Sequence, residues 1–537
     1  MAKINIKNFN KTISQTGNLL DILLNNNIPI ENPCNGKGTC GKCQVKIQAQ
    51  QAIPISPEER EIFTNSELNS GLRLACLCEV KKTDELEVEI LFKETKHRVL
   101  SSGTIPDFEK EVRASGYGLA IDIGTTTVVL MLVDLKTGAQ LTSSTRINSQ
   151  KQYGLDVLTR ITYEYNNPDD GIKKLQSTIV ADLNEMIDEV CQQAQVTKNT
   201  IVEIAVAANC TMLHMLLGVD ARSIGKAPYK PLFTKAQILK AKDIGLALTD
   251  EAVLYCLPSV SSYIGADIVA GVYTCELANK ENTLFIDIGT NGELALFSQG
   301  KLTSCSCAAG PALEGMNISS GMRAALGAIE NIVIKKDKIE LTTIGDKPAQ
   351  GLCGSGILSA IKELLRVGIV KKSGAFIKMD VLDTDDYRRK YLRMKENKRE
   401  FVIQQQAHNK NEIIVSMNDV RQVQLAKGAL LSGVMALLEQ ANIKTEDLVE
   451  VIVAGQFGAH LSGEILVKTG ILPPIAEKKI SYIGNSSCTG AYMCLMSTKV
   501  KQEIEKLANK IEYLELAESN NYEKLFSKCL IFPSEIN

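Results

Sequence analysis

The sequence predicts a multidomain chain in which a small α+β module precedes a larger α/β part built by duplication. Its length of 537 residues exceeds what one hydrophobic core usually serves. Residues 1–94 consist of short apolar stretches separated by turn residues, whereas strand-like and helix-like segments alternate from residue 117 onward. One strand-and-turn segment also occurs twice, which indicates a duplicated fold.

Composition narrows the classes of function. The 60 basic and 62 acidic residues give a formal net charge of -2, so no field favours nucleic acid or an anionic membrane. The first residues lack the apolar core of a signal peptide, and polar side chains interrupt the apolar run at 201–219, so no membrane span is expected. We therefore expect a cytoplasmic protein whose 15 cysteines are metal ligands or reduced core thiols.

The first module, residues 1–94, has the pattern of a β-grasp domain. The expected elements are strands at residues 3–9, 43–49 and 85–92 and a helix at residues 18–25. Residues 95–116 follow as a polar segment with Ser-Ser-Gly and Ile-Pro and no sustained period, which predicts a linker. Fully extended, such a linker would span tens of ångströms.

Four cysteines in this module predict a metal centre. Cys34, Cys40 and Cys43 have the spacing C-x5-C-x2-C in a glycine-rich loop, and Cys76 follows downstream. Plant-type ferredoxins use C-x4-C-x2-C, so the loop resembles theirs with one additional residue. Four thiolates hold the two irons of a 2Fe-2S cluster, and the glycines allow backbone amides to approach the sulfurs. The pattern predicts a 2Fe-2S ferredoxin-like domain.

Two alternatives stay open for these cysteines. One is a closed zinc site with four thiolates, although zinc sites usually use two C-x2-4-C pairs, whereas Cys76 and Cys78 form C-x-C. The other is a set of buried structural thiols. Cys76 is preferred over Cys78 as the fourth ligand because Arg-Leu-Ala-Cys matches the ferredoxin pattern, and exchange of the two stays open.

The duplicated segment is an apolar strand that ends in Asp-x-Gly-Thr. Residues 119–126 read Leu-Ala-Ile-Asp-Ile-Gly-Thr-Thr, and residues 284–291 read Leu-Phe-Ile-Asp-Ile-Gly-Thr-Asn, 165 positions later. Each copy continues into a further strand, at residues 128–133 and 293–297. A later apolar strand, residues 451–454, leads into Gly-Gln-Phe-Gly.

These turns resemble the phosphate-gripping hairpins of the actin, sugar-kinase and heat-shock chaperone superfamily. Glycine lets the backbone approach a phosphate, neighbouring amides and hydroxyls can donate to its oxygens, and each aspartate can hold hydrated Mg2+ or position the attacking water. The predicted catalytic aspartates are Asp122 and Asp287. The predicted nucleotide-binding residues are Gly124, Thr125, Thr126, Gly289, Thr290 and Asn291, with Gly455, Gln456 and Gly458 on the adenosine side. No P-loop motif occurs, and the alternative is a duplicated fold that has lost ATP binding.

We expect this ATPase part to comprise subdomain I at residues 117–280, subdomain II at residues 281–505 and a C-terminal tail at residues 506–537. The helical stretches expected are residues 175–193, 265–278, 356–367 and 424–440, and residues 499–516 have the spacing of a surface helix. The predicted fold is therefore a β-grasp ferredoxin-like domain, a linker and a duplicated actin-like ATPase.

Further motifs, together with the cysteine loop and the two turns, make the chain similar to a known family. They are Y-G-L-D-V-L-T-R-I at 153–161, N-C-T-M-L-H at 209–214, A-A-G-P-A-L-E-G at 308–315 and A-G-Q-F-G at 454–458. The chain resembles the reductive activators of corrinoid proteins found in acetogenic and related anaerobes. The resemblance implies that a 2Fe-2S cluster passes one electron to inactive cob(II)amide on a corrinoid protein of a methyltransferase system, such as an O-demethylase, and that ATP drives the step.

The resemblance also implies a homodimer formed through the ATPase part, a low-potential ferredoxin or flavodoxin as electron donor, and a position of the loop 310–315 near the corrinoid partner. Two other enzyme functions compete. One is a small-molecule kinase with a fused redox-sensing domain, and the other is the activator ATPase of a radical dehydratase. Such activators bind a 4Fe-4S cluster through cysteines of the ATPase half, so the ferredoxin module argues against the second. A redox-gated binding module without nucleotide turnover is a third alternative.

Overall fold

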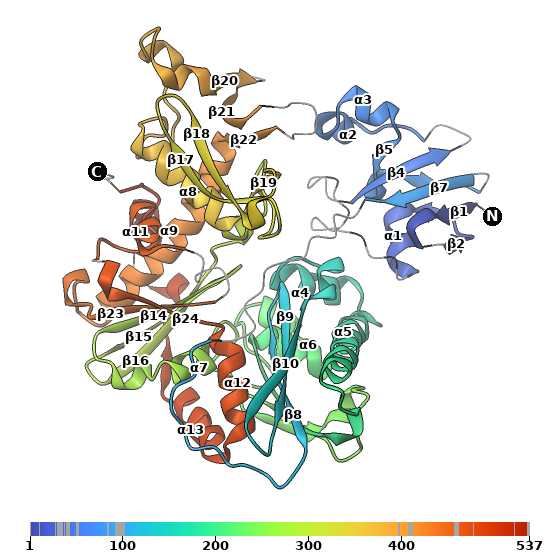
Figure 1. The fold of residues 1–537 in the computed structure, drawn as a ribbon, viewed down its shortest axis with the longest axis vertical. Coiled ribbons are helices and arrows are strands. Elements are labelled where there is room, and N and C mark those ends of the chain that lie inside the picture. The colour runs from blue at the N-terminus through green and yellow to red at the C-terminus, as the bar shows by residue number, and fades with distance from the viewer. Residues whose placement is uncertain are drawn as a thin grey trace. The chain divides into compact units, whose positions relative to one another are not determined.

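The structure is a computed structural model, and Figure 1 shows its course along the chain. The residues that it describes are 2–9, 11–26, 28, 30, 36, 38, 43–49, 53–82, 85–91, 103–395, 398–405, 412–455, 461–475, 477–519 and 521–533. They form two compact units. One unit comprises residues 1–94, 147–182 and 214–229, and the other comprises residues 95–146, 183–213 and 230–537.

A five-stranded mixed sheet organises the N-terminal module, as expected for a β-grasp domain. Its strands, in spatial order, are β2 (Lys11–Ile13), β1 (Lys3–Ile6), β7 (Glu85–Ile90), β4 (Gln44–Ala49) and β5 (Leu72–Leu74). The pair β1 and β7 is parallel, and the other pairs are antiparallel. The helices are α1 (Leu19–Asn25), α2 (Pro57–Ile62) and α3 (Asn65–Asn69), each with a side-chain cap at its start. Alternate residues of the strands fill one apolar core.

Two six-stranded sheets carry the duplicated segments. The first contains, in order, β10 (Ala139–Ile147), β9 (Thr127–Asp134), β8 (Tyr117–Ile123), β11 (Ile201–Ala208), β13 (Val253–Cys256) and β12 (Gln237–Lys240). The second contains β24 (Ile480–Gly484), β23 (Glu450–Ala454), β14 (Thr283–Ile288), β15 (Gly292–Ser298), β16 (Lys301–Cys307) and β25 (Ile511–Tyr513). In each sheet the repeated strand pairs antiparallel with the next strand and parallel with a later one, β8 with β9 and β11, β14 with β15 and β23. The predicted duplication is confirmed.

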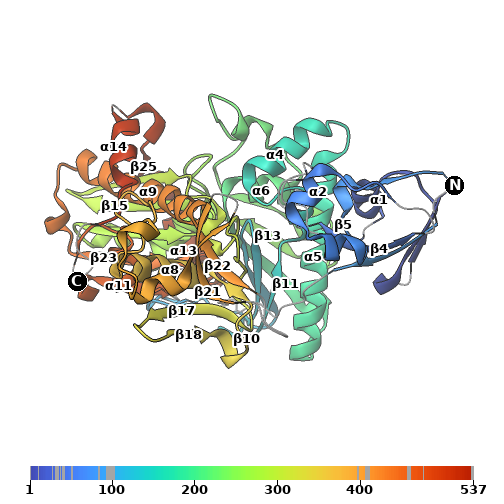
Figure 2. The ribbon, with the colours of Figure 1, turned by 90° about the horizontal axis from the view of Figure 1, so that it is seen from above.

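Helices and smaller sheets complete the fold. The helices are α4 (Val157–Asn166), α5 (Gly171–Ala194), α6 (Cys210–Leu217), α7 (Ala266–Thr274), α8 (Gly354–Arg366), α9 (Met417–Gln440), α11 (Gly463–Lys468), α12 (Ser486–Met496), α13 (Thr498–Ala508) and α14 (Tyr522–Cys529). The remaining strands are β3 (Gly17–Asn18) with β6 (Glu79–Val80), β18 (Ile339–Thr343) with β17 (Ala328–Ile334) and β19 (Gly351–Leu352), and β20 (Leu392–Lys395) with β21 (Lys398–Gln404) and β22 (Ile413–Ser416). Helix α8 lies against β17 (Figure 2), and α9 lies against β15 and β16. Within the described residues, no helix combines the length and apolar character needed to cross a bilayer.

Helices α12 and α13 return the chain from the second six-stranded sheet to the first. They follow β24, yet α12 packs on β8, β11 and α7, and α13 packs on α7 (Figure 1). The chain then adds β25 to the second sheet beside β16. The expectation of one helix over residues 499–516 is therefore wrong. The helix ends at Ala508, because the buried side chain of Ile511 belongs to a strand and pairs with Leu302.

The described part of the linker, residues 103–116, is docked on these elements, although most of its side chains are exposed. The Thr104 amide donates to the Ile483 carbonyl at the end of β24, at 3.0 Å. Farther along, the ring of Phe108 meets that of Tyr492 in α12 edge to face, with centroids 5.9 Å apart. A polar segment is thus anchored by a few specific contacts, which its composition does not reveal.

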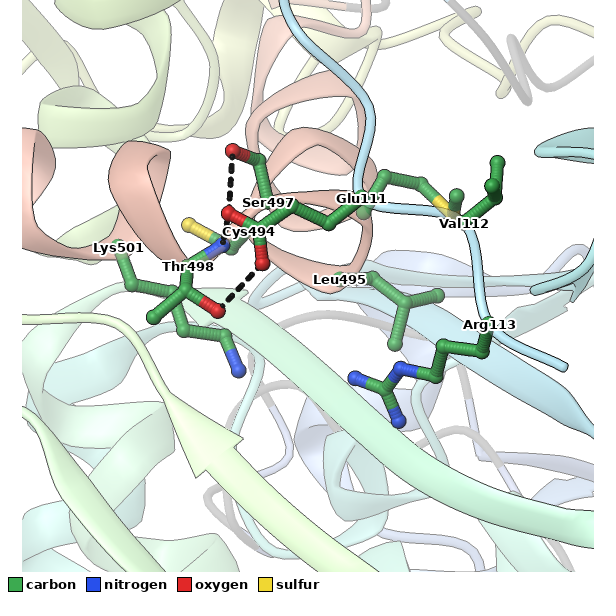
Figure 3. A pocket seen from close by; sticks show the side chains of 9 residues that line it. Glu111, Val112, Arg113, Cys494, Leu495, Ser497, Thr498 and Lys501 are labelled. Atoms are coloured by element: carbon green, nitrogen blue, oxygen red, sulfur yellow. Dashed lines mark hydrogen bonds between the residues drawn. The ribbon is translucent and has the colours of Figure 1, made fainter.

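Glu111 fixes the linker to the first turn of α13 (Figure 3). Its carboxylate accepts hydrogen bonds from the Thr498 hydroxyl at 2.7 Å, the Thr498 amide at 3.0 Å and the Ser497 hydroxyl at 3.5 Å. The bond from the Thr498 hydroxyl is the main cause that lowers the pKa of Glu111. A carboxylate at this position also complements the positive end of the helix dipole.

A polar cavity of about 250 Å³ lies beside this junction. Two of its cationic side chains, Arg113 and Lys501, both pair with Glu203, which is buried. Lys501 also lies over the ring of Tyr255, at 4.9 Å from its centroid. The charges of the cavity are therefore satisfied by one another, and we assign it no ligand.

Glu111→Ala should lower the free energy of local opening of the linker by about 0.5–1 kcal/mol. This is the cost of a lost helix cap, reduced because Glu111 is exposed to solvent. The amides of Glu111 and Arg113, which donate to the carbonyls of Met496 and Leu135, should then exchange with deuterium about two to five times faster. Hydrogen exchange followed by mass spectrometry measures this. Glu109→Ala, at an exposed linker position, is the matched control, and equal protection in both variants would contradict the assigned anchor.

Candidate cluster site and nucleotide site

A buried ion pair fixes the segment that leads into Cys76. Arg73 in β5 donates to both carboxylate oxygens of Glu59 in α2, at 2.9 and 2.8 Å. Glu59 also accepts the Leu74 amide at 2.9 Å. Burial alone would raise the pKa of Glu59, but the hydrogen bonds from Arg73 and from backbone amides lower it overall. The end of β5 is thereby held in one position.

Cys43 and Cys76 lie side by side in this module. Cys43 directly precedes β4, and Cys76 lies in the single turn after β5, Ala75–Leu77. The two sulfurs are 3.3 Å apart, and both residues are buried. The Ala75 amide donates to the Cys43 carbonyl at 2.9 Å, which ties the two segments together. Two adjacent buried sulfurs suit thiolate ligands of one metal centre.

Glycines of the cysteine loop approach the same turn. Gly36 and Gly38 have φ values of +80° and +72°, which side chains rarely allow. A Cβ on Gly38 would come within 3.1 Å of the Leu77 side chain, and one on Gly36 would lie 4.0 Å from the Cβ of Cys76. These two glycines thus lie against the Cys76 turn, as a cluster shared by loop and turn requires. The other two predicted ligands, Cys34 and Cys40, lie outside the described residues.

The geometry distinguishes Cys76 from Cys78, because the sulfur of Cys76 is the one beside Cys43. Cys76→Ala should therefore abolish the visible absorption of the cluster and most of the bound iron, whereas Cys78→Ala should retain both. Anaerobic reconstitution, absorption spectroscopy and iron analysis of the two variants test this. The reverse pattern would show that Cys78 is the ligand, and zinc in the wild-type protein would exclude the iron-sulfur assignment.

The first predicted phosphate turn joins β8 to β9. A Cβ on Gly124 would lie 2.8 Å from the Thr127 carbonyl oxygen, so the tight turn requires glycine. Asp122 lies near the end of β8, where Asn485 and Ser487 donate to its two carboxylate oxygens at 2.9 and 2.8 Å. Both donors come from the start of α12, and Asn485 is its N-cap. The chain that returns to the first sheet therefore fixes this predicted catalytic aspartate.

The second predicted turn joins β14 to β15 and carries Asp287. The Gly289 amide closes the turn by donating to a carbonyl two residues ahead, at 3.0 Å. Gly455 follows β23 with a φ of +84°, and a Cβ there would lie 2.4 Å from a carboxylate oxygen of Asp287. This first residue of the predicted adenosine segment therefore contacts the aspartate of the phosphate turn. Gln456 and Gly458 lie outside the described residues.

The polar side chains of the two turns are joined through other residues. Thr125 accepts a hydrogen bond from the Asn209 side chain at 3.0 Å. The hydroxyls of Thr126 and Thr290 both donate to Glu314, at 3.1 and 2.5 Å. Glu314 belongs to the loop that the resemblance places near the corrinoid partner, and it links the first predicted phosphate turn to the second.

Four carboxylates, Asp122, Asp267, Asp287 and Glu293, form what we call the acidic cluster. Burial is the main cause that raises the pKa of each. Repulsion by Asp287 and Asp122 adds to it at Asp267, and repulsion by Asp122 adds to it at Asp287, which raises both pKa values to about 7. The pKa of Glu293 is raised well above its usual range by burial and by Asp267 and Asp287. Each residue nevertheless keeps partial solvent exposure.

Five residues of this site are absent from the sequence prediction. Asp267 stands at the start of α7 in Gly-Ala-Asp, and Glu293 directly follows the second turn, so both had a local signal. Glu314 lies in a short turn between glycines of positive φ, which marks a specific loop but not its target. Asn485 and Ser487 reach Asp122 across more than 360 residues of sequence, and no local pattern announces such a contact.

Comparisons with known proteins agree with this architecture. Three family models match: a 2Fe-2S iron-sulfur cluster binding domain over residues 3–81, the RACo middle region over residues 117–280, and the C-terminal domain of RACo, the ASKHA domain, over residues 281–537. The corrinoid activation enzyme RamQ of Eubacterium limosum is 30% identical to the chain, and the alignment covers 98% of both. The chain belongs to the corrinoid activation enzyme family.

Two further proteins are also similar. The solved structure of a reductive activator for corrinoid, iron-sulfur protein has 30% sequence identity and a TM-score of 0.70, and the match covers 99% of this chain and 98% of that one. The [Co(II) methylated amine-specific corrinoid protein] reductase of Methanosarcina barkeri is 24% identical over 76% of each chain. The predicted fold is confirmed. The family models favour a 2Fe-2S cluster over zinc, and they favour ATP binding over a fold that has lost it. Neither a kinase nor a radical dehydratase activator is favoured.

The raised pKa values predict a specific pH dependence. Asp267 and Asp287 have folded-state pKa values of about 7, above those of an unfolded chain near 3.9. The stability that their protonation supplies is therefore present at low pH and is lost as the pH rises through 7. Asp287→Asn should raise the free energy of unfolding of the nucleotide-free protein at pH 8 by on the order of 2 kcal/mol, and with it the melting temperature. The increase should be smaller at pH 5.

Differential scanning calorimetry at both pH values measures this effect. Asp337→Asn, at an exposed turn between β17 and β18, is the matched control and should change neither midpoint. An Asp287→Asn variant that is less stable than the wild type at pH 8 would show that the aspartate is stabilised in its charged form.

Proposed function

We propose that the protein is an ATP-dependent reductive activator of a corrinoid protein, which transfers one electron to inactive cob(II)amide and restores cob(I)amide for methyl transfer. The observation that carries the proposal is the presence, in one chain, of the Cys43 and Cys76 pair and of two facing phosphate turns. The full-length similarity to RamQ supports it. A kinase would need only the second feature.

Cys34, Cys40, Cys43 and Cys76 are the proposed cluster ligands. A bound 2Fe-2S cluster supplies one-electron chemistry at a potential near roughly -400 mV for the plant type. The protein's own contribution is positional, since the Glu59 and Arg73 pair fixes β5 and the glycine loop packs against the Cys76 turn. Burial of both described cysteines keeps bulk water away from their sulfurs.

The two turns are the proposed phosphate site. Their backbone amides and the side chains of Thr125, Thr126, Thr290 and Asn291 are donors for phosphate oxygens. The acidic cluster is the proposed site of the Mg2+ that accompanies ATP. Among the described residues no group of three such side chains holds an ion by itself, which fits a metal that arrives with the nucleotide and completes its coordination with phosphate oxygens and water.

ATP is needed because the electron moves uphill. Reduction of cob(II)amide lies below the potential of a plant-type cluster, and each ~59 mV costs about 1.4 kcal/mol for one electron. Nucleotide binding and hydrolysis offset this gap if they favour a docked state in which the cobalt is easier to reduce, which is a coupling between two sites. A low-potential ferredoxin or flavodoxin is the proposed donor, and a cytoplasmic homodimer is the proposed form.

The deciding experiment is anaerobic. Reduced protein, ATP and a corrinoid protein loaded with cob(II)amide are mixed, and the cobalt spectrum is followed. Cob(I)amide or its methylated product should appear with ATP and be nearly absent without it. Asp122→Asn should slow ATP-dependent activation by about 10²-fold, because it removes a charge from the proposed metal site.

The Asp122→Asn protein should keep the cluster spectrum of the wild type, since Asp122 lies in the ATPase part and not in residues 1–94. Activation at the same rate without ATP would remove the proposed role of the nucleotide. Loss of the cluster in the variant would show that the two sites are not separate.

A further inference from the structure

Glu314 occupies a position that the proposed function has not yet used. It ends the short turn Pro311–Glu314 after β16, and its carboxylate accepts one hydroxyl from each phosphate turn. Glu314 therefore hydrogen bonds with both turns. Its two oxygens are divided between them, Oε2 to Thr126 and Oε1 to Thr290.

The backbone around Glu314 is rigidly placed. Gly315 has a φ of +77°, and a Cβ there would lie 2.3 Å from the Met322 carbonyl oxygen and 3.0 Å from that of Leu352. Ala312 and Leu313 are buried beneath it. This close packing supports a position of the carboxylate near the two turns when its hydrogen-bond partners change.

A bound nucleotide would compete with Glu314 for the hydroxyl hydrogens of the two threonines. Each threonine hydroxyl has a single hydrogen to donate. When Thr126 and Thr290 donate to phosphate oxygens, they no longer donate to Glu314, and the carboxylate is left beside the phosphate with both oxygens free to accept. A water molecule is the partner that fits, because it can donate to the carboxylate while its oxygen faces the phosphorus.

The carboxylates of the acidic cluster are placed differently. Both oxygens of Asp122 accept side-chain donors from α12, and one oxygen of Asp267 accepts the amide of the next residue in α7. Gly455 packs against Asp287. Glu314, by contrast, accepts two hydroxyls that the substrate itself can claim.

We propose that Glu314 is the catalytic carboxylate that orients and deprotonates the water attacking the terminal phosphate of ATP. The water oxygen bonds to the terminal phosphorus, the bond from that phosphorus to the bridging oxygen of ADP breaks, and one proton passes from water to Glu314 and then to solvent. The products are ADP and phosphate. This assignment rests on the proposed function, since it requires that ATP is hydrolysed.

Glu314→Gln tests it in the full-length protein with its cluster. Loss of a general base costs about 10²–10⁴-fold in turnover, so the ATPase rate should fall by at least about 10²-fold. Affinity for ATP, measured by calorimetry, should stay equal or increase, because a negative charge next to the phosphate is removed. Nucleotide extracted after incubation should be ATP rather than ADP, and Glu314→Asp should restore part of the rate. Glu340→Gln, on strand β18 where the carboxylate pairs with Lys335 and Lys338, should behave as the wild type.

Three results would overturn the proposal. Turnover within about threefold of the wild type would show that no proton goes to Glu314. A parallel loss of ATP affinity and of thermal stability would show that Glu314 is a structural tie between the turns. Wild-type protein that binds ATP but never hydrolyses it would overturn both this assignment and the proposed function, whereas the first two results leave the proposed function intact.

Discussion

The proposed nucleotide site depends on one electrostatic constraint, the proximity of like charges that are largely shielded from water. Burial is the main cause that raises the pKa values of Asp122, Asp267 and Asp287, and repulsion by Asp122 adds to it at the other two. Such an arrangement is unfavourable unless protons or a cation neutralise it. The side chains of Asn485 and Ser487 compensate only Asp122. A metal-bound nucleotide at the proposed site would relieve this unfavourable interaction, so ligand binding and stability would be coupled.

The connection between the two six-stranded sheets places hydrogen-bond donors beside Asp122. A helix that follows the last strand of the second sheet crosses to the first sheet and presents its N-terminal donors to Asp122. The linker is docked on the same junction: a Cβ on Gly103 would lie 2.5 Å from the Ile483 carbonyl oxygen and 2.9 Å from that of Asn485. The segment that leads from the redox module is thus in van der Waals contact with the residue that holds a nucleotide-site aspartate.

Local sequence patterns predicted the features that depend on residues close together in the sequence. The hairpins that carry Asp122 and Asp287 are adjacent strands with a glycine turn, and their duplication is visible because both copies keep the same order of residues. The Cys43 and Cys76 pair was predictable for a similar reason, since ligand spacing reflects the chemistry of the cluster. The contacts of Asn485, of Glu314 and of the linker were not predictable from the sequence, because they depend on tertiary packing between distant segments. A polar linker and a docked one have the same composition, and only the contacts of a few residues, such as Thr104, Phe108 and Glu111, distinguish them.

Each proposed site is assembled within one compact unit. The cysteine pair and the Glu59 and Arg73 brace belong to residues 1–94, and the phosphate turns, the acidic cluster and Glu314 all belong to the other unit. Neither set of residues needs the other to form its hydrogen bonds. The two sites share no residue among those described, so a coupling between them needs intervening parts of the chain or the corrinoid partner. The linker is one such part, because its described residues are anchored beside Asn485, which donates to Asp122 in the proposed nucleotide site.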